Sequence, residues 1–182
     1  MWANLPNLLT IGRILLVPVT VWSLIHGDYV VAFLSFAIAG ITDGLDGFLA
    51  RRYNLHTELG AYLDPLADKS LMVAVYVTLA ILQLIPGWLA IVVVTRDILI
   101  VSAVLLSRYL DQPVTIRPLF VSKANTLAQI ALAATVLFSL AIGVQHDGLL
   151  LFASACVAIL TFWSFTVYMQ VWLTHMTSGT KK

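Results

Sequence analysis

Residues 43–69 read DGLDGFLARRYNLHTELGAYLDPLADK, and this stretch places four aspartates at the ends of two apolar segments. They are Asp43, Asp46, Asp64 and Asp68. An ionised side chain near the centre of a bilayer costs at least about 2.5–3.5 kcal/mol. Four neighbouring carboxylates also repel one another, and the basic residues Arg51, Arg52 and Lys69 offset only part of that charge. A bound divalent metal is the simplest additional cation.

Helical geometry gathers these acids on two faces. At about 100° per residue, one arc of roughly 100° and another of roughly 80° hold the acids together with small residues. The first arc contains Asp43, Asp46, Gly47 and Ala50, and the second contains Gly60, Asp64 and Asp68. A short loop joins the two helices, so the faces can oppose each other. Carboxylate oxygens suit Mg²⁺ or Mn²⁺, and the small residues leave room for a ligand.

The composition around this stretch is that of a membrane protein. The chain has 182 residues, of which 60% are hydrophobic and 10% charged, and its mean hydropathy is +0.96. Soluble domains are roughly 45–50% apolar and about 25% charged. A soluble enzyme and a disordered chain are therefore excluded. The net charge of +1 gives no basic field for nucleic acid, and the single cysteine, Cys156, forms no intrachain disulfide.

The apolar segments predict an all-α polytopic membrane protein with six transmembrane helices. Each segment has about the 20 apolar residues that a spanning helix needs. The six expected spans are residues 8–25, 29–50, 59–82, 88–106, 124–143 and 148–173. Without a linker, repeat or low-complexity tract between them, residues 1–182 are predicted to form a single domain.

The distribution of basic residues predicts the orientation of the spans. Three loops contain no Lys or Arg, namely residues 26–28, 83–87 and 144–147. Basic residues lie instead between spans two and three, between spans four and five, and in the tail. Both termini and a polar active-site cavity are therefore expected to face the cytoplasm. The first residues resemble neither a signal nor a transit peptide, which favours a bacterial inner membrane.

The spacing D-x2-D-G-x2-A-R-x8-G-x3-D-x3-D from Asp43 to Asp68 resembles the signature of the CDP-alcohol phosphatidyltransferase family, with every fixed position matched. The segment from Asn4 to Arg13, which includes Asn7 and Thr10, is similar to the N-terminus of the phosphatidylglycerophosphate and cardiolipin synthase branch. The resemblance implies transfer of the phosphatidyl group of CDP-diacylglycerol to an acceptor hydroxyl, with release of CMP. It also implies a homodimer among membrane lipids.

The same resemblance implies a role for each signature residue. The four aspartates would hold two divalent cations, Mg²⁺ or Mn²⁺, and Asp68 would also be the general base. The remaining positions implied to bind the CDP-lipid are Asn7, Gly47, Ala50, Arg51 and Gly60. Among these, the small residues would make room for the cytidine nucleotide, and Arg51 would steady a phosphate.

The acceptor must be inferred from later spans. Arg96 lies inside span four and either forms a structural pair with Asp97 or binds the acceptor. Residues 117–129 resemble the Lys-Asn-Thr segment of cardiolipin synthases, whose acceptor is phosphatidylglycerol, and Val104 stands where phosphatidylglycerophosphate synthases carry a second arginine. Acceptor binding is therefore assigned to Arg96, Arg117 and Lys123, although the last two are alternatively interfacial anchors. Glycerol 3-phosphate is the second acceptor considered, and inositol or serine the third.

Two other classes remain as alternatives. Intramembrane aromatic prenyltransferases also use aspartate-rich helices and Mg²⁺, but they are longer and lack the Gly-x2-Ala-Arg unit. A non-enzymatic cation transporter or channel would line a path with acids across the membrane. The acids here gather at one side of two spans instead.

Overall fold

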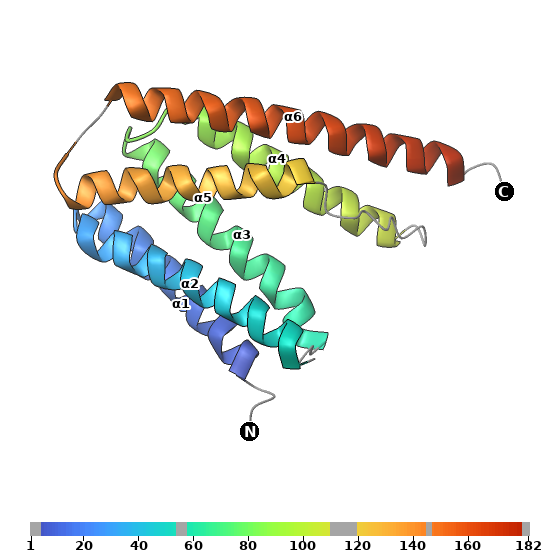
Figure 1. Ribbon diagram of the computed structural model, residues 1–182, viewed down its shortest axis with the longest axis horizontal. Helices are drawn as coiled ribbons and strands as arrows, with labels where there is room; N and C mark the ends of the chain where they lie inside the picture. The colour runs from blue at the N-terminus through green and yellow to red at the C-terminus, as the bar shows by residue number, and fades with distance from the viewer. Residues whose placement is uncertain (1–4, 54–57, 110–119, 145–146, 180–182) are drawn as a thin grey trace. The chain divides into compact units, whose positions relative to one another are not determined.

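The computed structural model describes residues 5–53, 58–109, 120–144 and 147–179, with side chains described outside 5–9, 45–68, 103–119, 145–147, 171 and 173–182. These residues form helices and no strand (Figure 1). The helices are α1 (Leu5–Ile25), α2 (Tyr29–Tyr53), α3 (Glu58–Ile81), α4 (Gly87–Tyr109), α5 (Phe120–Ala141) and α6 (Asp147–Gly179). The all-α class and the six predicted helical segments are confirmed, with ends shifted by up to six residues at the last helix.

Three of the helices end in the same way, in loops that lack basic residues. After α1, α3 and α5 the chain turns through a left-handed residue: Gly27 (φ 79°), Gln83 (φ 58°) and Gly143 (φ 71°). In each turn the next amide reaches back to a carbonyl five residues earlier, as in the 2.8 Å bond from Asp28 N to Ser23 O. This Schellman arrangement satisfies the last carbonyls of a helix and ends it sharply.

The described chain divides into two compact units. The first comprises Met1–Ile85 and Ala133–His146, and within it α1 packs against both α2 and α3. Its core is mainly apolar and includes Leu24, Ala32, Val75 and Leu79. The C-terminal part of α5 also belongs to this unit, where the ring of Phe138 lies 5.4 Å from that of Phe33.

The second unit comprises Pro86–Leu132 and Asp147–Lys182. Within it α4 packs against α6 around a core that includes Leu89, Val93 and Val157. The N-terminal part of α5 adds polar residues to this core, among them Asn125 and Gln129. Each unit therefore has its own interior, and each contains one of the charged sites described below.

The described residues combine apolar interiors with large apolar side chains on the surface and two buried arginines. Large apolar side chains are exposed, including Phe120 (85%), Ile81 (75%) and Phe162 (70%), whereas Arg13 and Arg96 are buried. Soluble proteins almost never bury arginine and seldom expose so many large apolar residues. Within the described residues, Phe120–Ala141 and Gly148–Gln170 are long and apolar enough to cross a membrane, and shorter apolar helices lie at Thr10–Ile25, Tyr29–Gly44 and Lys69–Ile81.

Candidate functional site

The predicted acidic site is carried by the end of α2 and the beginning of α3. The backbones at positions 43, 46, 64 and 68 are helical, so the spacing on each helix is the one the sequence predicts. Only Asp43 lies among the residues whose side chains are described. The other predicted site residues of this region lie outside them: Asn7, Asp46, Gly47, Ala50, Arg51, Gly60, Asp64 and Asp68. The opposition of the two faces therefore stays a prediction.

Asp43 forms an ion pair with Arg13 of α1. The Nη1 atom of Arg13 contacts the Oδ1 atom of Asp43, and the two side chains are 1% and 47% exposed. The buried guanidinium thus offsets the charge of the first signature aspartate, while that carboxylate stays half exposed. The sequence alone assigns Arg13 no role beyond its place in the segment from Asn4 to Arg13. The sequence nevertheless indicated that Arg13 has a partner, because an arginine inside an apolar span needs a group that offsets its charge.

The residues of this region suit a hard divalent cation in their chemistry. Asp43 presents an accessible carboxylate, and the other three predicted ligands are also carboxylates, the donors that Mg²⁺ and Mn²⁺ prefer. Among the residues whose side chains are described, no group of three or more His, Cys, Asp or Glu comes together. The other three predicted ligands lie outside those residues, so the metal site stays a prediction.

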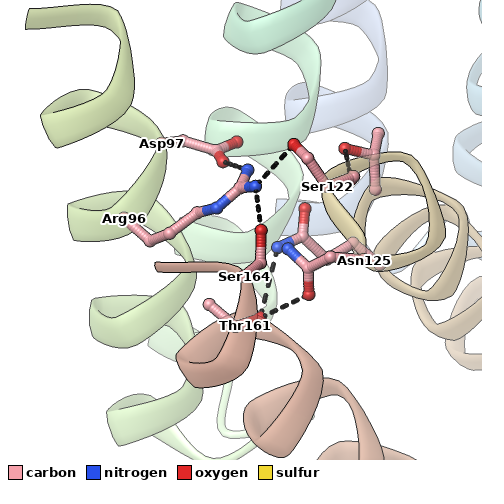
Figure 2. A network of polar contacts seen from close by, with 8 residues as sticks. Arg96, Asp97, Ser122, Asn125, Thr161 and Ser164 are labelled. Atoms are coloured by element: carbon pink, nitrogen blue, oxygen red, sulfur yellow. Dashed lines mark hydrogen bonds and ion pairs between the residues drawn. The ribbon is translucent and has the colours of Figure 1, made fainter. Parts of the chain in front are cut away.

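A second polar site lies in the other unit, where Arg96 connects three helices (Figure 2). Its Nη1 atom donates to Asp97 Oδ1 at 2.7 Å on the same helix. Its Nη2 atom donates to Ser122 Oγ of α5 at 2.8 Å and to Ser164 Oγ of α6 at 2.6 Å. Arg96 and Asp97 are each 4% exposed. The predicted Arg96–Asp97 pair is confirmed, and the guanidinium also joins α4 to α5 and α6.

The network continues along α5 and α6 through uncharged groups. Thr161 donates through its Oγ1 atom to Asn125 Oδ1 at 2.9 Å, and Gln129 Nε2 donates to Thr161 Oγ1 at 3.5 Å. Asn125 Nδ2 and Arg96 Nε are buried and have no hydrogen-bond partner within the described part of the chain. Since the Arg96 and Asp97 charges offset each other, the described members of this cluster carry no net charge, and two of its donors have no partner among the described residues. We call it the Arg96 cluster: Arg96, Asp97, Ser122, Asn125, Gln129, Thr161 and Ser164.

The other predicted acceptor residues differ from Arg96. Lys123 is exposed on α5, next to Ser122 of the cluster, and Arg117 lies outside the described residues. Sequence reasoning did not assign roles to Asn125, Thr161 or Ser164. The sequence feature that could have identified them is the spacing of polar residues within apolar helices. These residues lie at 122, 125 and 129 on α5 and at 161 and 164 on α6. These intervals place each set on one helix face.

Fold and site together define an all-helical protein with two candidate membrane spans, acids at the end of α2 and the beginning of α3, and a separate buried polar cluster. Comparison with known families is consistent with that class. The profile of the CDP-alcohol phosphatidyltransferase family matches residues 3–174, so the chain belongs to this family of phosphatidyltransferase enzymes. The resemblance inferred from the signature is confirmed.

Individual relatives carry two different names. The chain is 39% identical over 150 residues to a human cardiolipin synthase (CMP-forming), covering 74% of this chain and 50% of the relative. It is 37% identical over 173 residues to a CDP-diacylglycerol–glycerol-3-phosphate 3-phosphatidyltransferase of Salmonella choleraesuis, covering 92% of this chain and 93% of the relative. The chain thus spans about half the length of the human relative and nearly all of the bacterial one. Both acceptor classes are represented among its relatives.

Proposed function

We propose that this protein transfers the phosphatidyl group of CDP-diacylglycerol to phosphatidylglycerol, forming cardiolipin and releasing CMP. The acceptor hydroxyl oxygen would form a bond to the lipid-bearing β-phosphorus as the bond from that phosphorus to CMP breaks. The hydroxyl proton would pass to a carboxylate of the protein. The family supports the donor and the reaction type, and the neutral Arg96 cluster is the observation that favours this acceptor.

The acidic site would bind the CDP part of the donor. Asp43, Asp46, Asp64 and Asp68 would hold two divalent cations, Mg²⁺ or Mn²⁺, which supply charge stabilisation for the phosphoryl oxygens and the departing CMP. Asp68 would take the acceptor proton, and its value as a base would come from position, because nearby cations keep a carboxylate acidic. The remaining donor contacts would come from Asn7, Gly47, Ala50, Arg51 and Gly60.

Arg13 extends this site beyond the signature. Because its guanidinium contacts Oδ1 of Asp43 from a buried position, it would fix the carboxylate in one orientation. Groups that hold a metal ligand in place commonly affect metal affinity nearly as much as the ligands do. Arg13 is therefore proposed as a positioning residue for Asp43.

The setting would be a bilayer crossed by all six helices. The exposed apolar side chains of α1, α2, α4, α5 and α6 and the buried arginines fit a hydrocarbon surrounding. The absence of basic residues from three loops favours an active-site cavity that opens to the cytoplasm. We place the protein in a bacterial inner membrane, as a homodimer.

The Arg96 cluster supports the choice of acceptor. A phosphate monoester such as that of glycerol 3-phosphate carries close to two negative charges and is best matched by surplus cations. In the cluster the charge of Arg96 is already offset by Asp97, and Asn125 adds an uncharged donor. A glycerol hydroxyl or a phosphodiester oxygen fits these donors better. Arg117 and Lys123 would assist at the membrane surface.

The test is an acceptor comparison with the purified protein in detergent. CDP-diacylglycerol would be incubated with phosphatidylglycerol or with glycerol 3-phosphate, with Mg²⁺, Mn²⁺ or a chelator. Lipid mass spectrometry and CMP release are the measurements. We expect cardiolipin and CMP only when phosphatidylglycerol and a divalent ion are present. Product from glycerol 3-phosphate alone would refute the proposed acceptor, and no CMP with any acceptor would refute the transferase itself.

Glycerol 3-phosphate is the second candidate acceptor. The observation that favours it is the Salmonella relative, which matches almost end to end and is named for that acceptor. Under this alternative, Lys123 and Arg117 would supply the positive charge that the Arg96 cluster lacks. The same acceptor comparison separates the two candidates.

A further inference from the structure

The first turn of α5 is tied to a buried cation of another helix. The Nη2 atom of Arg96 on α4 donates to Ser122 Oγ at 2.8 Å and to Ser164 Oγ of α6 at 2.6 Å (Figure 2). Its Nη1 atom donates to Asp97 Oδ1 at 2.7 Å, so groups on α4, α5 and α6 fix the orientation of the guanidinium. The backbone of Ser122 is held as well, since Thr126 Oγ1 donates to Ser122 O at 3.2 Å. Ser122 is therefore fixed relative to both α4 and α6.

The same face of α5 carries two further polar side chains that tie it to α6. At about 100° per residue, Ser122, Asn125 and Gln129 fall within an arc of about 60°. Thr161 of α6 donates to Asn125 Oδ1 at 2.9 Å and accepts from Gln129 Nε2 at 3.5 Å. These bonds set the rotation of α5 about its own axis. Lys123 follows Ser122 in the chain and lies about 100° around the helix from it, on the exposed side.

We propose that Ser122 is a positioning residue, through which Arg96 holds the first turn of α5 and so places the Lys123 ammonium group for the phosphate of the acceptor. The inference rests on the proposed function, in which Lys123 assists acceptor binding, and deepens it by naming what holds Lys123 in place. Phosphatidylglycerol carries a phosphodiester and glycerol 3-phosphate a phosphate monoester. Both offer anionic oxygens that an ammonium group binds, so the inference concerns the phosphate that the two acceptors share.

A hydrogen bond at this point matters because the end of a helix is weakly held by itself. The first four N–H groups of a helix have no carbonyl partner within it, and helix ends open more readily than helix centres. Phe120 and Lys123 are both exposed. Of residues 120–123, only Ser122 has a side-chain hydrogen bond to another helix within the described part of the chain. Because lysine has a flexible four-carbon stem, its backbone must be held if its ammonium group is to meet one phosphate in a defined geometry.

The test is a double-mutant cycle of Ser122→Ala and Lys123→Gln, measured as the acceptor KM with CDP-diacylglycerol at saturation. We expect Ser122→Ala to raise this KM about five-fold and Lys123→Gln about ten-fold, with kcat changed less than two-fold. The double variant should show only the ten-fold rise of Lys123→Gln, because a residue that acts through Lys123 then has nothing left to position. Effects that multiply to about fifty-fold would overturn the proposal, since a general loss of packing does not depend on Lys123.

Two further variants and two acceptors complete the cycle. Ser122→Thr keeps the hydroxyl and should hold the KM within two-fold of that of the unmodified protein. Ser154→Ala, at a buried serine of α6, is the matched control and should leave the KM unchanged. The cycle is run with phosphatidylglycerol and with glycerol 3-phosphate. A single ten-fold limit with the lipid assigns the phosphate to a lipid head group, and the same limit with glycerol 3-phosphate assigns it to a free monoester; either result supports the positioning role of Ser122.

A spin label at position 123 tests the positioning without turnover. Lys123→Cys would be labelled in a Cys156→Ser background, with and without Ser122→Ala. We expect the replacement of Ser122 to narrow the spectral lines of this label through faster motion. A label at Leu127→Cys, one turn further along and at a position that is 68% exposed, should give unchanged lines. Unchanged lines at position 123, or the same narrowing at both positions, would overturn the proposal. If no acceptor yields CMP, the proposed function fails, and these spectra still decide whether Ser122 holds the first turn of α5.

Discussion

Among the residues whose side chains are described, two arginines are buried, and each pairs with an aspartate in a different way. Arg13 pairs with Asp43 on another helix, and that acid is 47% exposed. Arg96 pairs with Asp97, its neighbour in the chain, and both side chains are 4% exposed. The first pair keeps its carboxylate accessible to a ligand. Both charges of the second pair are buried within the protein.

Under the proposed function, the first region would bind the CDP part of the donor, and the second would bind a hydroxyl or phosphodiester oxygen of the acceptor. Near Asp43 the protein concentrates negative charge, and only further cations can balance it. Around Arg96 the charges cancel, and hydroxyl and amide groups complete the network. Four predictions test whether the two regions have these separate roles.

The largest expected effect follows from replacing Asp68, the proposed general base of the acidic region. Asp68→Asn should lower the turnover number by about 10²–10⁴-fold, the usual contribution of a general base. Binding of CDP-diacylglycerol, measured by calorimetry with Mn²⁺, should remain. Asp28→Asn, in the exposed turn after α1, is the control and should leave turnover unchanged. Turnover near normal in Asp68→Asn would show that another group takes the proton.

The Arg96–Asp97 pair should contribute more to the free energy of unfolding than the Arg13–Asp43 pair. Asp97→Asn leaves the Arg96 charge buried and unbalanced, which should lower the free energy of unfolding by about 3–5 kcal/mol. Asp43→Asn should cost about 1 kcal/mol or less, because water screens a half-exposed acid. Denaturant titration in mixed micelles is the measurement. Equal losses would remove the distinction between the two pairs.

Arg13 should act on metal affinity through Asp43. Arg13→Lys keeps the positive charge but loses the planar fork that orients a carboxylate. We expect metal-dependent CDP binding to weaken by about 10–100-fold, as is typical for groups that position a metal ligand. The acceptor KM should not change. Unaltered affinity for Mn²⁺ and CDP would show that Arg13 only balances charge.

The smallest expected effect concerns a single hydrogen bond of the Arg96 cluster. Ser164→Ala removes the acceptor that lies 2.6 Å from Arg96 Nη2, while Ser122 still holds the same nitrogen. A hydrogen bond of this kind contributes about 1 kcal/mol, so the acceptor KM should rise roughly five-fold. Ser154→Ala, at another buried serine of α6, is the control. A rise in the KM for CDP-diacylglycerol instead would place Ser164 at the donor site.

Much of the architecture was predictable from the sequence. The apolar segments gave helices whose positions are confirmed, because each continuous apolar run needs its backbone hydrogen bonds satisfied internally. The turns after α1 and α5 were marked by Gly27 and Gly143, which adopt positive φ without strain. The turn at Gln83 carried no such mark. Its left-handed residue is not a glycine, and only the three-dimensional structure identifies it.

The sites were predictable to different degrees. The acidic region was visible because its residues lie within 26 positions at fixed spacing, and the family that this spacing indicated is confirmed. The partnership of Arg13 with Asp43 spans 30 positions, and the contact of Arg96 with Ser164 spans 68. Local spacing specifies which side chains share a helix face, but it does not specify which helix packs against that face.

The sequence alone thus determined the helical class, the family and the acidic residues that would handle the donor. These properties depend on composition and on short-range periodicity, both of which are local. The tertiary structure decided that Arg13 pairs with Asp43 and that Arg96 joins α4 to α5 and α6. Such features depend on the packing of distant segments, where burial determines which charges are balanced and which donors remain for a ligand.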